Sequence, residues 1–108
     1  MKFSTAASAF VLGFCATGTA ALAAEQIHIA GSSTVLPYAT IVAEAFAEAN
    51  PNFKAPIVEG GGTGAGLKEF CKGVGDDTID VADASRKIKA EELDACKAAG
   101  VTEVQEIR

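Results

Sequence analysis

A glycine-rich run, Gly60–Gly66, is the feature that most constrains how this chain can fold. It follows an apolar, strand-like pair, Ile57-Val58, and leads directly into a helix-like run that begins at Leu67. Glycine lets the backbone approach a ligand closely, and a helix N-terminus directs its N–H groups and the positive end of its dipole toward that ligand. A strand, a glycine turn and a helix in this order therefore predict an anion site.

A second turn of the same kind occurs earlier in the chain. Gly31 to Thr34 offer three successive hydroxyl groups after a strand-like run, whereas a helix cap needs only one hydroxyl. We expect Thr34 to cap the helix that follows and Pro37 to lie in its first turn, where the missing N–H of proline costs little. The surplus hydroxyls indicate a second ligand-binding turn.

Strand-like and helix-like runs alternate along the chain. The expected strands are residues 26–30, 55–59 and 79–84, with a weak candidate at 101–107, and the expected helices are residues 34–49, 67–72 and 90–99. This alternation predicts an α/β fold with a mainly parallel sheet and helices on both of its faces. Ligands of such sheets bind beyond the carboxyl ends of the strands. Both turns, and the Ser85-Arg86 pair after the third strand, are therefore expected at one edge.

Helical spacing also predicts which side chains point inward. In the first helix the expected apolar stripe is Tyr38, Val42, Ala45, Phe46 and Ala49, and Asn50-Pro51 should end that helix. In the last helix the expected inner face is Leu93, Ala95, Cys96 and Ala99, and Gly100 suits the C-terminal cap.

The N-terminus is typical of a cleaved secretory signal. Lys2 precedes an apolar stretch, and Ala21-Leu22-Ala23 has the small-x-small pattern of a cleavage site. We predict a signal peptide over residues 1–23 and a mature chain that begins near Ala24. Lipid attachment at Cys15 is an alternative, disfavoured by the bulky residue before it.

Composition limits the partners and the size of the fold. The formal net charge is −5, and cleavage of the signal removes one of the 9 basic residues and none of the 14 acidic ones. A nucleic-acid partner is therefore not expected. The remaining residues, about 85, suffice for one small core and one domain or lobe.

Two cysteines, Cys71 and Cys96, remain after cleavage. In an oxidising compartment an even pair indicates a disulfide, and two buried free thiols are the alternative. A metal site is not expected, because the single histidine, His28, lies on a strand and no CxxC or HxxxH spacing is present.

Arg86 is the candidate cation for an anionic ligand. Its planar donor fork suits a tetrahedral oxyanion, whereas Lys87 and Lys89 are expected to be solvated. Asp80 and Asp83 flank the third strand, and either could accept a hydrogen from a protonated ligand. The sequence does not choose between these two carboxylates.

Other readings of the turns are weaker. The glycine run fits GxGxxG/A with Asp80 at the spacing of a ribose-binding acid, but it follows the second strand and not the first. An exported phosphate-ester-handling enzyme would need a metal cluster or a nucleophile–base pair, and neither is evident. An adhesive role for a small secreted domain has no specific support.

Three motifs in register resemble the periplasmic phosphate-binding protein of the Pst ABC transporter. They are Gly31–Pro37, Glu59–Phe70 and Ile79–Arg86, which together span most of the mature chain. The resemblance implies that residues 24–108 are the N-terminal lobe of a two-lobe, type II periplasmic binding protein. It implies a monomer without cofactor, metal or catalytic residue that captures inorganic phosphate and delivers it to a membrane permease.

The resemblance also implies the site residues: Ser33, Thr34 and Val35 in the first turn, Thr63 and Gly64 in the glycine turn, and Ser85 and Arg86 after the third strand. Many members have an Asp where this chain has Ser85, and that Asp accepts the hydrogen of monohydrogen phosphate. Sulfate or another oxyanion is therefore an alternative ligand here. Because a second lobe supplies the remaining contacts in the family, we expect weak or undetectable phosphate binding by this chain alone.

Overall fold

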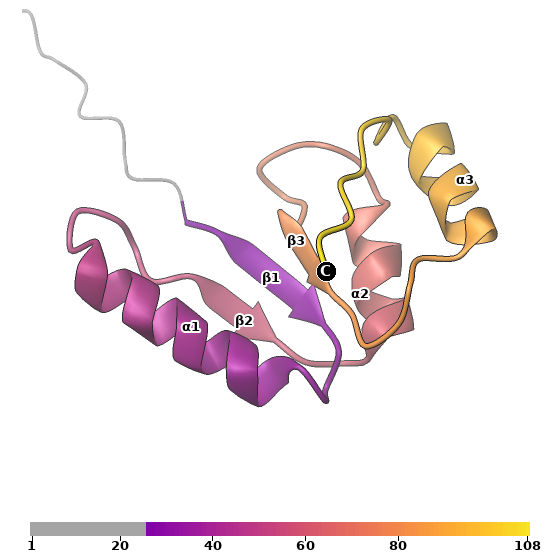
Figure 1. Cartoon of the computed structure of the whole chain (residues 1–108). Helices are drawn as coiled ribbons and strands as arrows, with labels where there is room; N and C mark the ends of the chain where they lie inside the picture. The colour runs from indigo at the N-terminus through magenta and orange to yellow at the C-terminus, as the bar shows by residue number, and fades with distance from the viewer. Residues whose placement is uncertain (1–25) are drawn as a thin grey trace, which may run out of the picture.

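The computed structural model describes residues 26–108, so the predicted signal peptide and cleavage site lie outside the described part. Strands and helices alternate as predicted (Figure 1). In chain order they are β1 (His28–Gly31), α1 (Leu36–Ala49), β2 (Ile57–Glu59), α2 (Thr63–Phe70), β3 (Val81–Asp83) and α3 (Ala90–Ala98).

The three strands form one parallel sheet in the order β2-β1-β3. The chain crosses from β1 to β2 through α1 and then returns past β1 to β3 through α2. Because such crossovers are right-handed, opposite directions of travel place α1 and α2 on opposite faces of the sheet. The predicted α/β fold with a parallel sheet is confirmed.

The strands differ from the prediction mainly at their ends. β1 begins and ends later than expected, and β2 and β3 are each shorter than expected. The candidate strand at 101–107 is wrong: these residues form no strand. Val101 is buried, and Val104 packs with it against the cysteine pair. This segment therefore contributes apolar side chains to the core and not the hydrogen bonds of a further strand.

The predicted inner face of α1 is wrong except at Phe46. Tyr38 and Val42 are 70% and 67% exposed, and Ala45 and Ala49 are exposed as well. The face turned to the sheet is centred on the buried Ala43. Apolar residues lie nearly all round this helix, so spacing alone could not select the face that packs. The predicted helix end is confirmed, because α1 stops before Asn50, whose side chain donates to the carbonyl of Phe46 at 2.9 Å.

Close packing of α2 on β1 depends on Gly66. A Cβ built at this position would overlap the backbone of Ala30 and Gly31. The absence of a side chain therefore lets the helix lie directly on the strand, and Leu67 beside it is buried.

The last helix, α3, packs against α2 (Figure 1). The Cys71–Cys96 disulfide joins these two elements, which confirms the predicted pairing and excludes free thiols at these positions. Cys96 is fully buried, but Ala95 and Ala99 are exposed, so half of the predicted inner face is wrong. Gly100 follows the helix with a φ of +88°, as expected of a C-terminal glycine.

Candidate oxyanion site at the carboxyl edge of the sheet

Three turns meet at the carboxyl edge of the sheet, as the sequence predicts (Figure 1). Backbone hydrogen bonds tie them together. The N–H of Gly62 donates to the carbonyl of Gly31 at 2.7 Å, and the N–H of Ser32 donates to the carbonyl of Asp83 at 3.0 Å. The parallel register therefore brings segments that are distant in sequence to one surface.

In the first turn, the residue at the N-cap position of α1 is Val35 and not Thr34, and no side chain caps this helix. Ser32 is 2% exposed, and its hydroxyl accepts the N–H of Val35, the residue that precedes α1, at 3.3 Å. The predicted Thr34 cap is wrong because the chain makes one more turn before the helix begins. Ser33 and Thr34 are exposed, and within residues 26–108 their N–H groups donate no hydrogen bond. Both residues are thus accessible to a ligand.

The glycine turn opens α2 in the way that an anion site requires. Gly62 precedes the helix with a φ of +101°, a conformation that favours glycine. The first N–H group of α2 that donates a hydrogen bond within the helix is that of Gly66, whose acceptor is the carbonyl of Gly62 at 3.0 Å. The N–H groups of Thr63, Gly64 and Ala65 therefore have no acceptor in the helix and point out of its N-terminus.

The glycine turn and the segment after β3 are joined through two hydroxyl groups. The Thr63 hydroxyl accepts the N–H of Ser85 at 3.0 Å and lies 3.2 Å from the Ser85 hydroxyl. The sequence separates these residues widely, and the fold brings them into contact. Thr63 and Ser85 therefore form one polar surface beside the first turn of α2.

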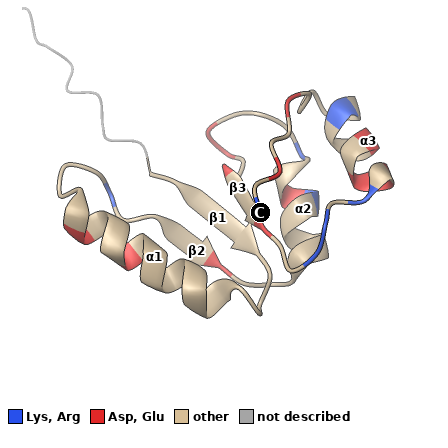
Figure 2. Ribbon diagram, in the orientation of Figure 1, with Lys and Arg blue, Asp and Glu red and all other residues tan. Residues whose placement is uncertain are grey.

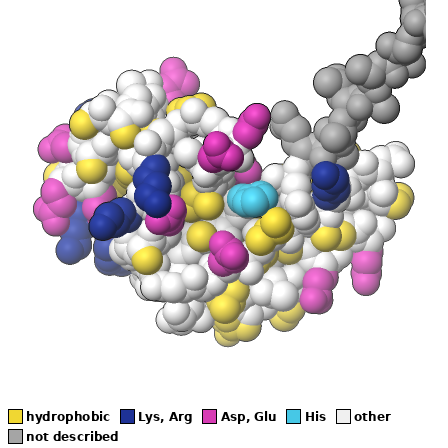
Figure 3. Space-filling model, turned by 180° about the vertical axis from the view of Figure 1, so that it is seen from behind, with side chains coloured by type: hydrophobic (Ala, Val, Ile, Leu, Met, Phe, Trp, Pro, Cys, Tyr) yellow, Lys and Arg dark blue, Asp and Glu magenta, His cyan; other side chains and the backbone are white. Residues whose placement is uncertain are grey.

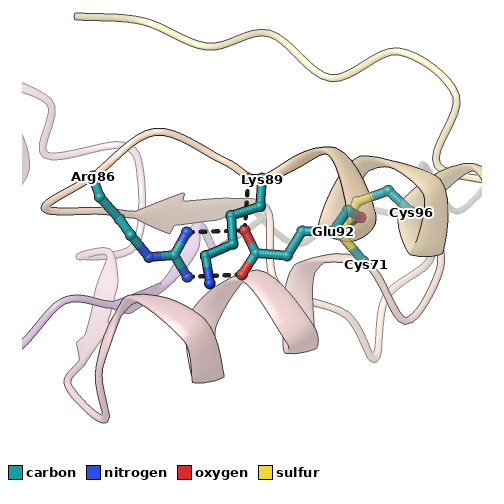
Figure 4. Close-up of a disulfide and its surroundings, with 5 residues drawn as sticks. All are labelled: Cys71, Arg86, Lys89, Glu92 and Cys96. Atoms are coloured by element: carbon teal, nitrogen blue, oxygen red, sulfur yellow. Dashed lines mark hydrogen bonds and ion pairs between the residues drawn. A yellow bond between two sulfur atoms is a disulfide. The ribbon is translucent and has the colours of Figure 1, made fainter.

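Arg86 extends this surface with a fixed positive charge. Its guanidinium forms a two-pronged ion pair with Glu92 of α3, with Nη1 to Oε2 at 2.9 Å and Nη2 to Oε1 at 2.8 Å (Figure 4). The hydrogen bonds with Arg86, aided by the N–H of Lys89, lower the pKa of Glu92 to about 2. The same ion pair raises the pKa of Arg86 above its usual range, so both groups remain charged at physiological pH.

The two candidate carboxylates lie at opposite ends of β3. Asp80 precedes the strand and accepts the N–H of His28 at 2.8 Å, at the amino edge of the sheet. Asp83 ends the strand at the carboxyl edge, and a Cβ built at Gly31 would overlap its backbone and carboxylate. Both carboxylate oxygens of Asp83 are buried and find no hydrogen-bond partner among residues 26–108. The structure thus favours Asp83 over Asp80 as the acidic residue near the turns.

Charge is unevenly distributed over the described part of the chain. Arg86, Lys87 and Lys89 lie on the connection between β3 and α3, drawn in blue in Figure 2. In Figure 3, most of the visible basic side chains lie toward one end of the face, one lies near the other end, and acidic side chains spread across it. Basic groups therefore lie beside the turns in a chain that is acidic overall.

Residues 26–108 hold no group of side chains typical of a metal site and no membrane-spanning helix. No three side chains of His, Cys, Asp or Glu gather there as a metal site would require. None of the helices in this range has the length and apolar character needed to cross a bilayer.

Sequence reasoning missed Glu92 as a partner of the site. The sequence feature that could have indicated Glu92 is its position three residues after Lys89. At this spacing an acidic side chain accepts the N–H of the residue that precedes a helix. The structure shows that hydrogen bond, from Lys89 N to Oε2 of Glu92, at 2.8 Å. The ion pair with Arg86 depends on the path of the chain between β3 and α3, which spacing alone does not reveal.

Comparison with known proteins places the chain among binding proteins. The model of the PBP superfamily domain matches residues 16–108. Protein SphX of Synechococcus elongatus is 44% identical over 75 residues, which cover 69% of this chain and 21% of that protein. Protein SphX of Synechocystis is 38% identical over 72 residues, covering 67% of this chain and 20% of that protein.

A solved structure is similar as well. The crystal structure of a possible phosphate binding protein from Planctomyces limnophilus has a TM-score of 0.62 and 42% sequence identity, and the match covers 71% of this chain and 25% of that one. The chain thus matches about a fifth to a quarter of the length of these relatives.

Proposed function

This chain belongs to the family of PBP superfamily domains, and on that premise we propose that it forms one lobe of an exported binding protein that captures inorganic phosphate. In this proposal the lobe acts in the periplasm, and the assembled protein delivers its ligand to the permease of an ABC transporter. The site residues are Ser33, Thr34, Val35, Thr63, Gly64, Ser85 and Arg86.

One observation carries the proposal: unused N–H donors from two turns and the guanidinium of Arg86 meet at one accessible edge of the sheet. Backbone N–H groups at a helix N-terminus suit an oxyanion, and arginine adds a planar pair of donors. The structural relative described as a possible phosphate binding protein agrees with this chemistry.

Binding without catalysis is favoured by the position of the histidine. His28 begins β1, whereas Ser33 and Ser85 lie at the other end of the sheet. A serine nucleophile needs a base within hydrogen-bond reach, and within residues 26–108 Ser85 bonds to Thr63 and no hydrogen bond joins Ser33 or Ser85 to a histidine. Hydrolysis of a phosphate monoester by the purified chain would contradict this part of the proposal.

Residues 26–108 hold an anion from one side only, so its other side faces water. Each hydrogen bond made in water has a small net value, and we expect an affinity of about 1 mM or weaker for the isolated chain. Submicromolar binding would show that the site is complete within this chain, which contradicts the one-lobe proposal.

The test is a titration of the isotope-labelled chain with phosphate, followed by NMR, and then with sulfate. Shifts of the amides of Ser33, Thr34, Thr63 and Gly64 by phosphate would support the site. Equal shifts by sulfate would mean an oxyanion site without preference for phosphate. If neither anion moves these amides, the turns are ordinary helix caps and the proposed function fails.

A further inference from the structure

We infer that Glu92 is a positioning residue: it grips one edge of the Arg86 guanidinium and thereby holds the other edge over the N-terminus of α2, ready for an oxyanion. This inference rests on the proposed function, and it adds a residue from α3 that lies outside the three turns. Figure 4 shows the Glu92 carboxylate reaching from α3 toward Arg86.

Arg86 has more N–H donors than the hydrogen bonds that it makes within residues 26–108. A guanidinium has five N–H groups in a fixed plane. Nη1 donates to Oε2 of Glu92 at 2.9 Å and to the carbonyl of Lys87 at 3.0 Å, and Nη2 donates to Oε1 of Glu92 at 2.8 Å. These three bonds leave Nε–H and the second N–H of Nη2 without a partner within residues 26–108. Both lie on the same edge of the plane, so together they form a second donor fork.

The position of Nη2 shows where that free edge lies. A Cβ built at Gly64 would be 3.7 Å from Nη2 of Arg86, so the guanidinium lies beside the first turn of α2. The N–H groups of Thr63 and Gly64 emerge from the same turn. One oxyanion at this place can therefore accept hydrogen bonds from the helix and from the free edge of Arg86.

Glu92 is itself held in place, as a positioning residue must be. Its Oε2 also accepts the N–H of Lys89 at 2.8 Å, and its side chain is 21% exposed. The disulfide between Cys71 and Cys96 fastens α3, the helix that carries Glu92, to α2. Arg86 is thus linked to α2 through Glu92, α3 and the disulfide in series.

Positioning and simple electrostatics predict opposite results when Glu92 loses its charge. Glu92→Gln removes a negative charge near an anion site, and charge alone would make phosphate bind more tightly. Loss of the fixed guanidinium would weaken binding instead, because an arginine that must be ordered on binding loses rotamer entropy. The sign of the change therefore separates the two explanations.

The experiment compares phosphate affinity by NMR titration in the wild-type chain and in Glu92→Gln, Arg86→Gln and the double variant. We expect Glu92→Gln to weaken binding by about threefold or more and to have no further effect in the Arg86→Gln background, since Glu92 acts through Arg86. Glu69→Gln is the matched control: it disrupts the exposed ion pair with Lys72 at the far end of α2 and should leave the affinity unchanged.

A second readout needs no ligand. The Nε–H group of Arg86 should be rigid in the wild-type chain and mobile in Glu92→Gln. The heteronuclear NOE of its Nε–H signal measures this difference. Tighter or unchanged phosphate binding in Glu92→Gln, or an equal loss in the Arg86→Gln background, would overturn the inference.

If phosphate moves no amide of the wild-type chain, the proposed function fails separately. The Nε–H readout then still decides whether Glu92 orders Arg86: retained order in Glu92→Gln overturns that role, and lost order supports it.

Discussion

The buried carboxylate of Asp83 is unusual among the polar side chains of residues 26–108, because neither of its oxygens has a hydrogen-bond partner there. Buried polar groups without partners are rare in folded proteins, and they often mark sites where a ligand completes the bonding. Asp83 lies against Gly31, at the start of the first turn. We therefore expect it to accept the hydrogen of a protonated oxyanion, because a carboxylate is a stronger acceptor than the hydroxyl of Ser85.

Asp83→Asn tests this role. The variant keeps the shape of the side chain but removes the charge-assisted acceptor, so the preference for phosphate over sulfate should fall by roughly threefold or more. Affinities for both anions, measured by NMR titration, check the result. Asp80→Asn is the control because Asp80 lies at the opposite edge of the sheet and bonds to His28. An unchanged preference in Asp83→Asn would remove Asp83 from the site.

The Glu92 carboxylate makes a prediction about acid stability. Its pKa is about 2 in the folded chain because Arg86 and Lys89 donate hydrogen bonds to it, whereas its usual value is 4.5. A carboxylate whose pKa is lowered on folding stabilises the folded state above pH 4.5. This contribution disappears as the pH falls from about 4.5 toward 2. Wild type should therefore lose more stability over this range than Glu92→Gln, as measured by urea unfolding.

The control for the acid experiment is Glu69→Gln. The side chains of Glu69 and Lys72 are about half exposed, and exposed pairs contribute little to stability. The stability of Glu69→Gln should therefore fall with pH in the same way as that of the wild type. If Glu92→Gln also follows wild type, the ion pair between Arg86 and Glu92 does not persist in solution.

At the scale of single elements, the order and type of helices and strands were predictable, but the packing face of α1 was not. The sequence of α1 is apolar on several sides, and Ala43 faces the sheet while Ile41 is 63% exposed. Small alanines allow close approach to the sheet, and larger side chains would hold the helix away. The spacing rule detects a helix, but the side that packs is selected by the space available above the sheet.

Two glycines in α2 give a matched pair of predictions. Gly66→Ala places a methyl group where the backbone of Ala30 and Gly31 lies, so α2 must move away from β1. We expect a loss of about 2 kcal/mol or more in the free energy of unfolding. At Gly64 the added methyl group meets only Nη2 of Arg86 at 3.7 Å, an ordinary contact. Gly64→Ala should be neutral, or stabilising by up to about 1 kcal/mol, because alanine favours the helix.

Urea unfolding of both variants checks this pair. Similar stability changes in the two would mean that the approach of α2 to β1 is looser than the structure indicates. A destabilised Gly64→Ala would place the strain in the turn instead.

At the scale of the whole molecule, the sequence predicted where the turns converge but not which side chains meet there. Parallel register brings the ends of β1, β2 and β3 to one edge for any chain with this alternation. The pairing of Thr63 with Ser85, and of Arg86 with Glu92, depends on loop paths that no periodicity encodes. Tertiary contacts of this kind were therefore beyond sequence reasoning, although all but Glu92 had been selected as candidates.

Within residues 26–108, buried residues lie both at the sheet and around the disulfide, and the disulfide stabilises the latter. Those between the sheet and its helices include Ala30 and Leu67. Those around the disulfide are Cys71, Cys96 and Val101. Few apolar side chains support α3, so the covalent link should supply a large share of the stability of this part.

Reduction of the disulfide should lower the melting temperature by about 10 °C or more, because a link across 25 residues constrains the unfolded chain by roughly 3 kcal/mol. Calorimetry with and without reductant measures this shift, and the Cys71→Ser/Cys96→Ser variant should melt at the low temperature under both conditions. The same reduction should weaken phosphate binding, because α3 carries the Glu92 that holds Arg86. An unchanged melt would refute the link, whereas a lowered melt with unchanged affinity would separate the stability of α3 from the oxyanion site.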